Sequence, residues 1–100
     1  MTDSLPNIQV IEETETMLEP MYSVIIHNDE VTPMDFVVEA LKQIFFLGND
    51  RAAEVMLAAH IKGSAYVQTL SKPEAAKRIQ KARYAAQVEG YPLRFTLEPE

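Results

Sequence analysis

Residues 21–36 read MYSVIIHNDEVTPMDF, and this stretch decides the fold. Its first part is β-branched and aromatic up to His27, which predicts a strand, and the near-continuous apolarity favours a central one. Three polar or acidic residues then form a turn. Thr32 is suited to be a helix N-cap, with Pro33 at the first helical position and Asp35 completing a T-x-x-D capping pattern. The stretch therefore predicts a central strand, a turn and the start of a helix.

Two helices are predicted to follow in succession. Apolar residues recur at helical spacing after residue 34, and Gly48 is expected to end the first helix in a left-handed conformation. Asn49 or Asp50 is then expected to cap a second helix, and Gly63 to end it.

The rest of the chain supplies a strand, a helix and a strand. AYVQTL at residues 65–70 and LRFTL at residues 93–97 have strand patterns. Between them, Ser71 and Glu74 form an S-x-x-E capping pattern, and Gly90 is expected to stop the helix. The order βααβαβ predicts an α+β fold, a two-layer sandwich in which a three-stranded antiparallel sheet is covered by three helices.

The charge divides the chain into two parts. The net charge is -6, and the first twenty residues hold five acidic residues and no Lys or Arg. Residues 1–19 are therefore predicted to be a flexible acidic arm, or alternatively a dispensable tail, and residues 20–100 a folded domain.

No signal or transit peptide is expected, and no apolar run approaches the length of a membrane span, so no membrane partner is expected.

The residue types argue against catalysis and against a cofactor. The chain has no cysteine, no nucleophile motif and no glycine-rich phosphate loop. Asp29, Glu30 and Asp35 do not follow calcium-loop spacing, and His27 and His60 lie on different predicted elements. We therefore expect no enzyme activity, no metal and no cofactor.

Nucleic-acid binding is also not expected. Several Lys and Arg residues cluster on the third predicted helix, opposite its apolar face. Such a cluster without interleaved aromatic residues is typical of a solvated helix face, and the acidic arm would compete with phosphate.

A binding site for an amine is the remaining interpretation of the opening stretch. Asn28 offers an amide oxygen, Asp29 a carboxylate and His60 a neutral ring nitrogen, all of which accept hydrogen bonds. Apolar residues that could surround an adjacent side chain are Met34, Val37, Met56 and Ala59. From these residues alone, a purely structural role for a lone histidine and a few core methionines stays open.

The chain resembles the ClpS family, the adaptors of the ATP-dependent Clp protease. The resemblance is carried over residues 20–100 by YSVIIHNDEVTPMDFVVEAL, AAEVMLAAHIKGSA and YPLRFTLEPE. It implies a non-catalytic adaptor that recognises N-degrons, substrates with a destabilising first residue such as Leu, Phe, Tyr or Trp. The implied partner is an AAA+ Clp unfoldase of the ClpA or ClpC type, in the bacterial cytosol or a plastid stroma.

The resemblance also implies roles for individual residues. Asn28, Asp29 and His60 match the residues that hold the α-amino group, and Glu30 would add weaker attraction. Thr32 matches the pocket rim and Met34 a gate that excludes β-branched side chains. The remaining pocket positions are Val37, Met56, Ala59 and Leu93.

Three positions depart from the family pattern. Ala59 is smaller than the valine often found there, which predicts a roomier pocket. Pro73 replaces a glutamate and Arg78 a lysine of the segment implied in unfoldase docking, so Glu74 and Arg78 are the predicted docking pair.

The alternative function is a protein-interaction module on the same scaffold, similar to a ribosomal-stalk-like domain, without amine recognition.

Overall fold

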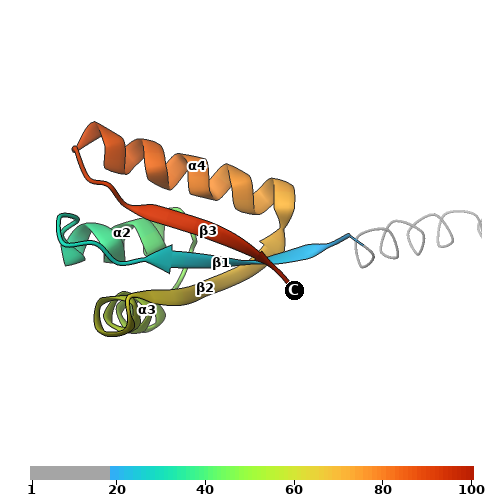
Figure 1. The fold of residues 1–100 in the computed structure, drawn as a ribbon, viewed down its shortest axis with the longest axis horizontal. Helices are drawn as coiled ribbons and strands as arrows, with labels where there is room; N and C mark the ends of the chain where they lie inside the picture. The colour runs from blue at the N-terminus through green and yellow to red at the C-terminus, as the bar shows by residue number, and fades with distance from the viewer. Residues whose placement is uncertain (1–18) are drawn as a thin grey trace, which may run out of the picture.

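A computed structural model describes residues 19–100, so all but the last residue of the predicted arm lies outside the described part. The elements occur in the predicted order βααβαβ, and the α+β class is confirmed (Figure 1). They are β1 (Met21–His27), α2 (Met34–Gln43), α3 (Asn49–Lys62), β2 (Ser64–Ser71), α4 (Lys72–Val88) and β3 (Arg94–Pro99).

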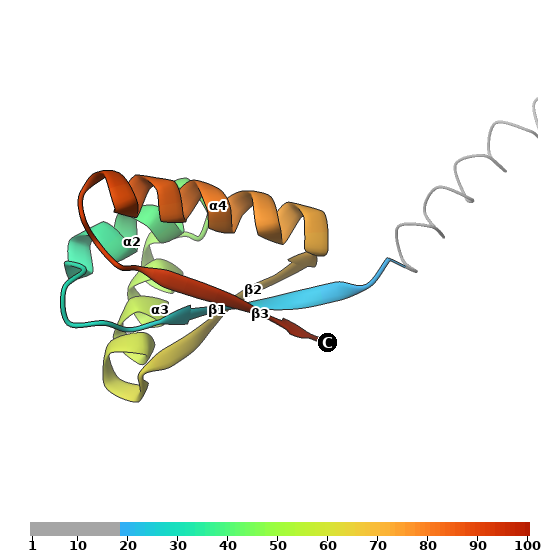
Figure 2. The ribbon, with the colours of Figure 1, turned by 45° about the horizontal axis from the view of Figure 1, so that its top comes forward.

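The three strands form one antiparallel sheet in the order β2-β1-β3, so β1 is central as predicted. His27, at the end of β1, lies opposite Ser64 of β2 and Arg94 of β3. The register with β2 shifts once, between Val24 and Ile25. In Figures 1 and 2, α2 and α3 lie at the end of the sheet where β1 finishes, and the C-terminus lies at the other end.

One hydrophobic core joins the sheet to all three helices. Val24 and Ile26 of β1 are almost completely buried, because side chains alternate along a strand and these two point toward the helices. The rings of Phe45 and Phe95 pack 5.1 Å apart at the centre of this core. The other buried members that define it are Val37, Leu41, Ala52, Val55, Ala59, Val67, Ala75, Ile79, Ala82, Ala86 and Leu93.

The capping signals were right for α4 and for the end of α3. The Ser71 hydroxyl accepts a hydrogen bond from the Glu74 N–H at 3.4 Å, and Pro73 lies in the first turn of α4. Gly63 and Gly90 have left-handed φ values of 95° and 82°, which glycine adopts at little cost. None of the described helices is long and apolar enough to cross a membrane.

The predicted boundary between the first two helices was wrong. α2 ends at Gln43, and the left-handed residue is Phe46, with a φ of 59°. Gly48 has extended backbone and is itself the N-cap of α3, so neither Asn49 nor Asp50 is the cap. A residue far away in sequence stabilises the turn, because the Gln68 side chain of β2 donates a hydrogen bond to the Phe45 carbonyl at 3.1 Å.

The predicted capping box at Thr32 was also wrong. α2 begins at Met34 with Pro33 as its N-cap, and no side chain caps it. The Thr32 N–H and hydroxyl both donate to Asp29, so the Thr32 side chain is part of the loop and lies one residue before the N-cap. Among residues 19–100, Asp35 accepts only from the N–H of the next residue, Phe36.

Candidate functional site

A cavity of about 630 Å³ lies at the end of β1. The loop after β1, the first turn of α2, one face of α3 and the residue before β3 enclose it. All the residues predicted for amine binding and for the side-chain pocket line it, together with four that sequence reasoning missed. The complete lining is Ile26, His27, Asn28, Asp29, Glu30, Val31, Thr32, Pro33, Met34, Val37, Met56, Ala59, His60 and Leu93.

Hydrogen bonds to Asp29 hold the loop after β1. Its Oδ1 accepts from the N–H groups of Val31 at 2.8 Å and Thr32 at 2.6 Å, and its Oδ2 accepts from the Thr32 hydroxyl at 2.8 Å. The Asn28 N–H donates to the Gly63 carbonyl at 2.9 Å, which ties the loop to the end of α3. The loop therefore has a fixed shape next to His60.

Asp29 combines this organising role with a free acceptor position. Burial acts to raise the pKa of Asp29, but the hydrogen bonds from Thr32 and Val31 outweigh it and bring the pKa below the ordinary value of 3.8. The carboxylate is thus charged at neutral pH. A carboxylate has about four acceptor positions, so the three bonds leave one on Oδ2 for a ligand.

Replacing Asp29 with asparagine is expected to destabilise the fold by about 1–2 kcal/mol at neutral pH, because charge-assisted hydrogen bonds become neutral ones. The folded-state pKa of Asp29 is lowered, so its stabilisation is present above pH 3.8 and lost as the pH falls through the folded value. Urea unfolding of both chains between pH 7 and pH 3 measures this. A difference in the free energy of unfolding that stays constant over that range would contradict it.

The other predicted acceptors are open to solvent. Asn28, Glu30 and His60 are exposed and line the same cavity. Neither the Asn28 amide nor the His60 ring forms a side-chain hydrogen bond within residues 19–100. Their acceptor atoms are therefore available to a ligand. In the same range no three His, Asp or Glu side chains are grouped to hold a metal ion.

The inner part of the cavity is apolar. Val37, Ala59 and Leu93 are buried and form its walls, and Met56 is half-buried. Met34 differs, because in the first turn of α2 it remains 44% exposed. Met34 is thus a rim residue of the cavity rather than a core residue.

His27 is one of the residues that sequence reasoning missed. Its Nε2 lies 2.7 Å from the Thr96 hydroxyl. Burial, with a smaller contribution from Arg94, lowers the pKa of His27 against an opposing effect of Glu98. His27 is therefore uncharged at neutral pH and places no positive charge beside the acceptors. Its position directly before Asn28 was the only sequence signal that could have predicted it as a cavity residue.

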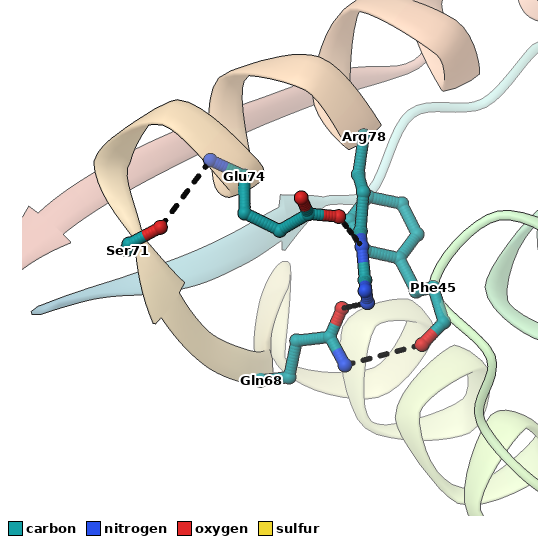
Figure 3. A network of polar contacts seen from close by, with 5 residues as sticks. All are labelled: Phe45, Gln68, Ser71, Glu74 and Arg78. Carbon is teal, nitrogen blue, oxygen red and sulfur yellow. Dashed lines mark hydrogen bonds and ion pairs between the residues drawn. The ribbon is translucent and has the colours of Figure 1, made fainter. Parts of the chain in front are cut away.

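Glu74 and Arg78, the predicted docking pair, do not line the cavity. They lie near the start of α4, directly after β2. The last residue of β2 pairs with Met21, the first residue of β1, whereas the cavity lies at the other end of β1. Arg78 Nε donates to Glu74 at 2.8 Å and Nη1 donates to Gln68 at 3.1 Å (Figure 3). The bond to Arg78 is the main cause that lowers the pKa of Glu74. The structure thus shows two separate polar regions.

Comparison with known proteins identifies the family. The family model described as ATP-dependent Clp protease adaptor protein ClpS matches residues 17–96. The chain is 40% identical to ClpS 2 of Mesorhizobium japonicum, over 95% of this chain and 92% of that protein. It is 37% identical to ClpS of Vibrio atlanticus, over 93% of this chain and 90% of that protein.

A solved structure gives the same result. The structure of Agrobacterium tumefaciens ClpS2 bound to L-phenylalaninamide superposes with a TM-score of 0.78 at 36% identity, covering 82% of this chain and 99% of that one. These matches favour the adaptor function over the alternative of a stalk-like module. The chain belongs to the ClpS family, the adaptor proteins of the ATP-dependent Clp protease.

Proposed function

We propose that this chain binds the free N-terminal amine and the large hydrophobic first residue of N-degron substrates, and delivers them to the Clp protease. One observation carries the proposal. The acceptors of Asn28, Asp29 and His60 share one cavity with buried apolar walls. As a ClpS adaptor the chain is not itself an enzyme.

The amine fits the acceptors by number and charge. An α-ammonium group has three N–H donors, and a free N-terminus is largely protonated at neutral pH. Asn28 Oδ1, the free position on Asp29 Oδ2 and a ring nitrogen of His60 would each accept one. Hydrogen bonds with an ionised donor are stronger than neutral ones. Glu30, exposed at the mouth, adds attraction for the positive charge.

The first side chain would enter the apolar part of the cavity. Val37, Met56, Ala59 and Leu93 would contact it, and Met34 and Thr32 would lie at the rim. The Agrobacterium ClpS2 structure supports this, because L-phenylalaninamide carries a free amine and a phenyl side chain.

The family shows the Clp protease as the partner, and it supports a finer proposal for the unfoldase and the location. The finer proposal is that the Clp partner is an AAA+ unfoldase of the ClpA or ClpC type, contacted through Glu74 and Arg78. The named relatives are bacterial, which supports the bacterial cytosol as the site of action. Residues 20–100 would be the degron-binding domain and residues 1–19 an arm used in delivery.

Binding of labelled peptides that differ only in the first residue tests the function. We expect saturable binding of peptides that begin with Phe or Leu and have a free amine, and much weaker binding of those that begin with Gly or Ser. Fluorescence anisotropy with the dye at the C-terminal end measures it. Equal affinity for all of these peptides would contradict degron recognition.

Deleting residues 1–18 is expected to leave stability and peptide affinity nearly unchanged, because the described core and cavity use only later residues. Delivery is expected to slow, since eighteen fully extended residues could span roughly 60 Å and reach into an unfoldase pore. The measurement is the degradation rate of a Phe-first reporter by the assembled Clp protease. An unchanged rate would show that the segment is a dispensable tail.

A further inference from the structure

Phe46, in the loop between α2 and α3, combines an unusual backbone conformation with an exposed ring. Its φ of 59° lies in the left-handed region, where a side chain with a Cβ is disfavoured. Phe46 is 68% exposed, whereas Phe45 is fully buried. Glycine or asparagine would fit this turn at lower cost. The local backbone thus does not explain an aromatic residue here, which suggests that the ring has a use outside the core.

The exposed ring lies beside a fixed guanidinium group. The Arg78 Cζ is 4.9 Å from the centroid of the Phe46 ring, within the range of a cation–π interaction. Glu74 and Gln68 hold the same guanidinium by hydrogen bonds, and Gln68 also holds the Phe45 carbonyl (Figure 3). Arg78 has five N–H donors, and those on Nη2 have no acceptor within residues 19–100. A partner would find a ring and a donor already in place, which lowers the entropic cost of binding.

The surroundings of this pair carry positive charge. α4 holds five of the nine Lys and Arg residues of the chain and a single acidic residue, although the chain as a whole has a net charge of -6. Lys77 and Lys81 are exposed on α4 near Arg78 in sequence, and Lys81 lies one turn along the same face. This surface complements an acidic partner.

We infer that Phe46 and Arg78 form the centre of the surface that contacts the Clp ATPase. The ATPase supplies an apolar recess for the phenyl ring and a carboxylate for the free N–H groups of Arg78. This inference rests on the proposed adaptor function and extends the docking surface from α4 onto the α2–α3 loop. Aromatic and Arg residues are the types that dominate binding at protein interfaces. Phe46 does not line the degron cavity, so the adaptor can hold substrate and ATPase together.

The test is Phe46→Asn in the full chain. Affinity is measured against a ClpA-type hexamer, and in parallel a ClpC-type hexamer, held with a non-hydrolysable ATP analogue. We expect binding to the cognate hexamer to weaken at least about tenfold, while Phe46→Tyr keeps the ring and retains affinity. The thermal midpoint of Phe46→Asn should be equal to or above that of the unaltered chain, because asparagine tolerates the left-handed turn. Affinity for a Phe-first peptide should not change.

Tyr84→Asn is the matched control, because Tyr84 is an aromatic residue on α4 that is 70% exposed, and within residues 19–100 it has no hydrogen bond to Arg78. It should bind the hexamer like the unaltered chain. Full affinity of Phe46→Asn, or equal losses in Phe46→Asn and Tyr84→Asn, would overturn the role of Phe46. An unaltered chain that binds neither hexamer would overturn this surface and the delivery function together. An unaltered chain that binds a hexamer but no degron peptide would overturn the degron function only.

Discussion

Acetylating the N-terminus of a Phe-first peptide is expected to weaken its binding to this chain by about 3 kcal/mol or more, which is over a hundredfold. Acetylation removes the positive charge and two of the three donors, and adds a group that the mouth of the cavity must accommodate. The acceptors of Asn28, Asp29 and His60 would then lose their partners in a partly desolvated site. Isothermal titration of the free and acetylated peptides measures the difference.

Two controls locate this effect at the amine. Amidating the C-terminus of the same peptide should leave the affinity unchanged. His60→Ala should weaken binding of the free peptide and reduce the penalty for acetylation, because one acceptor of the ammonium is already missing. Equal affinity for free and acetylated peptides would refute the amine site.

Replacing Met34 with alanine is expected to admit peptides that begin with Val or Ile while retaining those that begin with Leu or Phe. Met34 is a half-exposed rim residue that would contact a bound side chain near its β-carbon, where Val and Ile are branched. Overcrowding at such a contact costs about 1–3 kcal/mol, so removing it should raise the affinity for Val and Ile about tenfold to a hundredfold. A peptide panel varying only the first residue measures the change.

Ala59→Val is the opposing variant. Ala59 is buried in the cavity wall, so added volume there should narrow the pocket and penalise the largest first residue, Trp, more than Leu. If Met34→Ala weakens every peptide equally and gains none, Met34 is a packing residue and does not act as a gate.

The features that the sequence predicted correctly depend on neighbouring residues. Ser71 caps α4 because the N–H of Glu74 lies three residues away, and Gly63 ends α3 because no Cβ opposes its left-handed φ. β1 was placed at the centre of the sheet because a nearly continuous apolar run is typical of a well-covered strand, and central strands are better covered than edge strands. For the two helix ends, the signal and its consequence lie within a few residues of each other.

The helix boundaries that failed depend on competition or on distant partners. Gly48 is the residue that favours a left-handed φ, yet Phe46 adopts it because burial of Phe45 and the bond from Gln68 set where α2 ends. Thr32 is a good N-cap by type, but its hydroxyl is directed to Asp29, and α2 begins one residue later with Pro33 at the N-cap position. The D-x-x-T spacing is a turn signal that could have indicated this outcome.

The residues that line the cavity also divide into those that could be predicted from the sequence and those that could not. Asn28, Asp29 and His60 could be selected by type, since each offers an acceptor, and the structure brings them to one cavity. Ile26, Val31 and Pro33 offer no side-chain acceptor, and the His27 ring lies against the Thr96 hydroxyl. They line the cavity because the end of β1, the following loop and α3 converge there, and that convergence requires the tertiary fold.

The central claim is that the cavity at the end of β1 holds an amine together with a hydrophobic side chain. The most direct measurement is a titration of the ¹⁵N-labelled chain with L-phenylalaninamide, followed by amide chemical shifts. We predict saturable shifts centred on residues 28–34 and 56–60, with the first turns of α4 unaffected, and no such shifts with the N-acetylated compound. Shifts that centre on another surface, or equal shifts with both compounds, would contradict the claim.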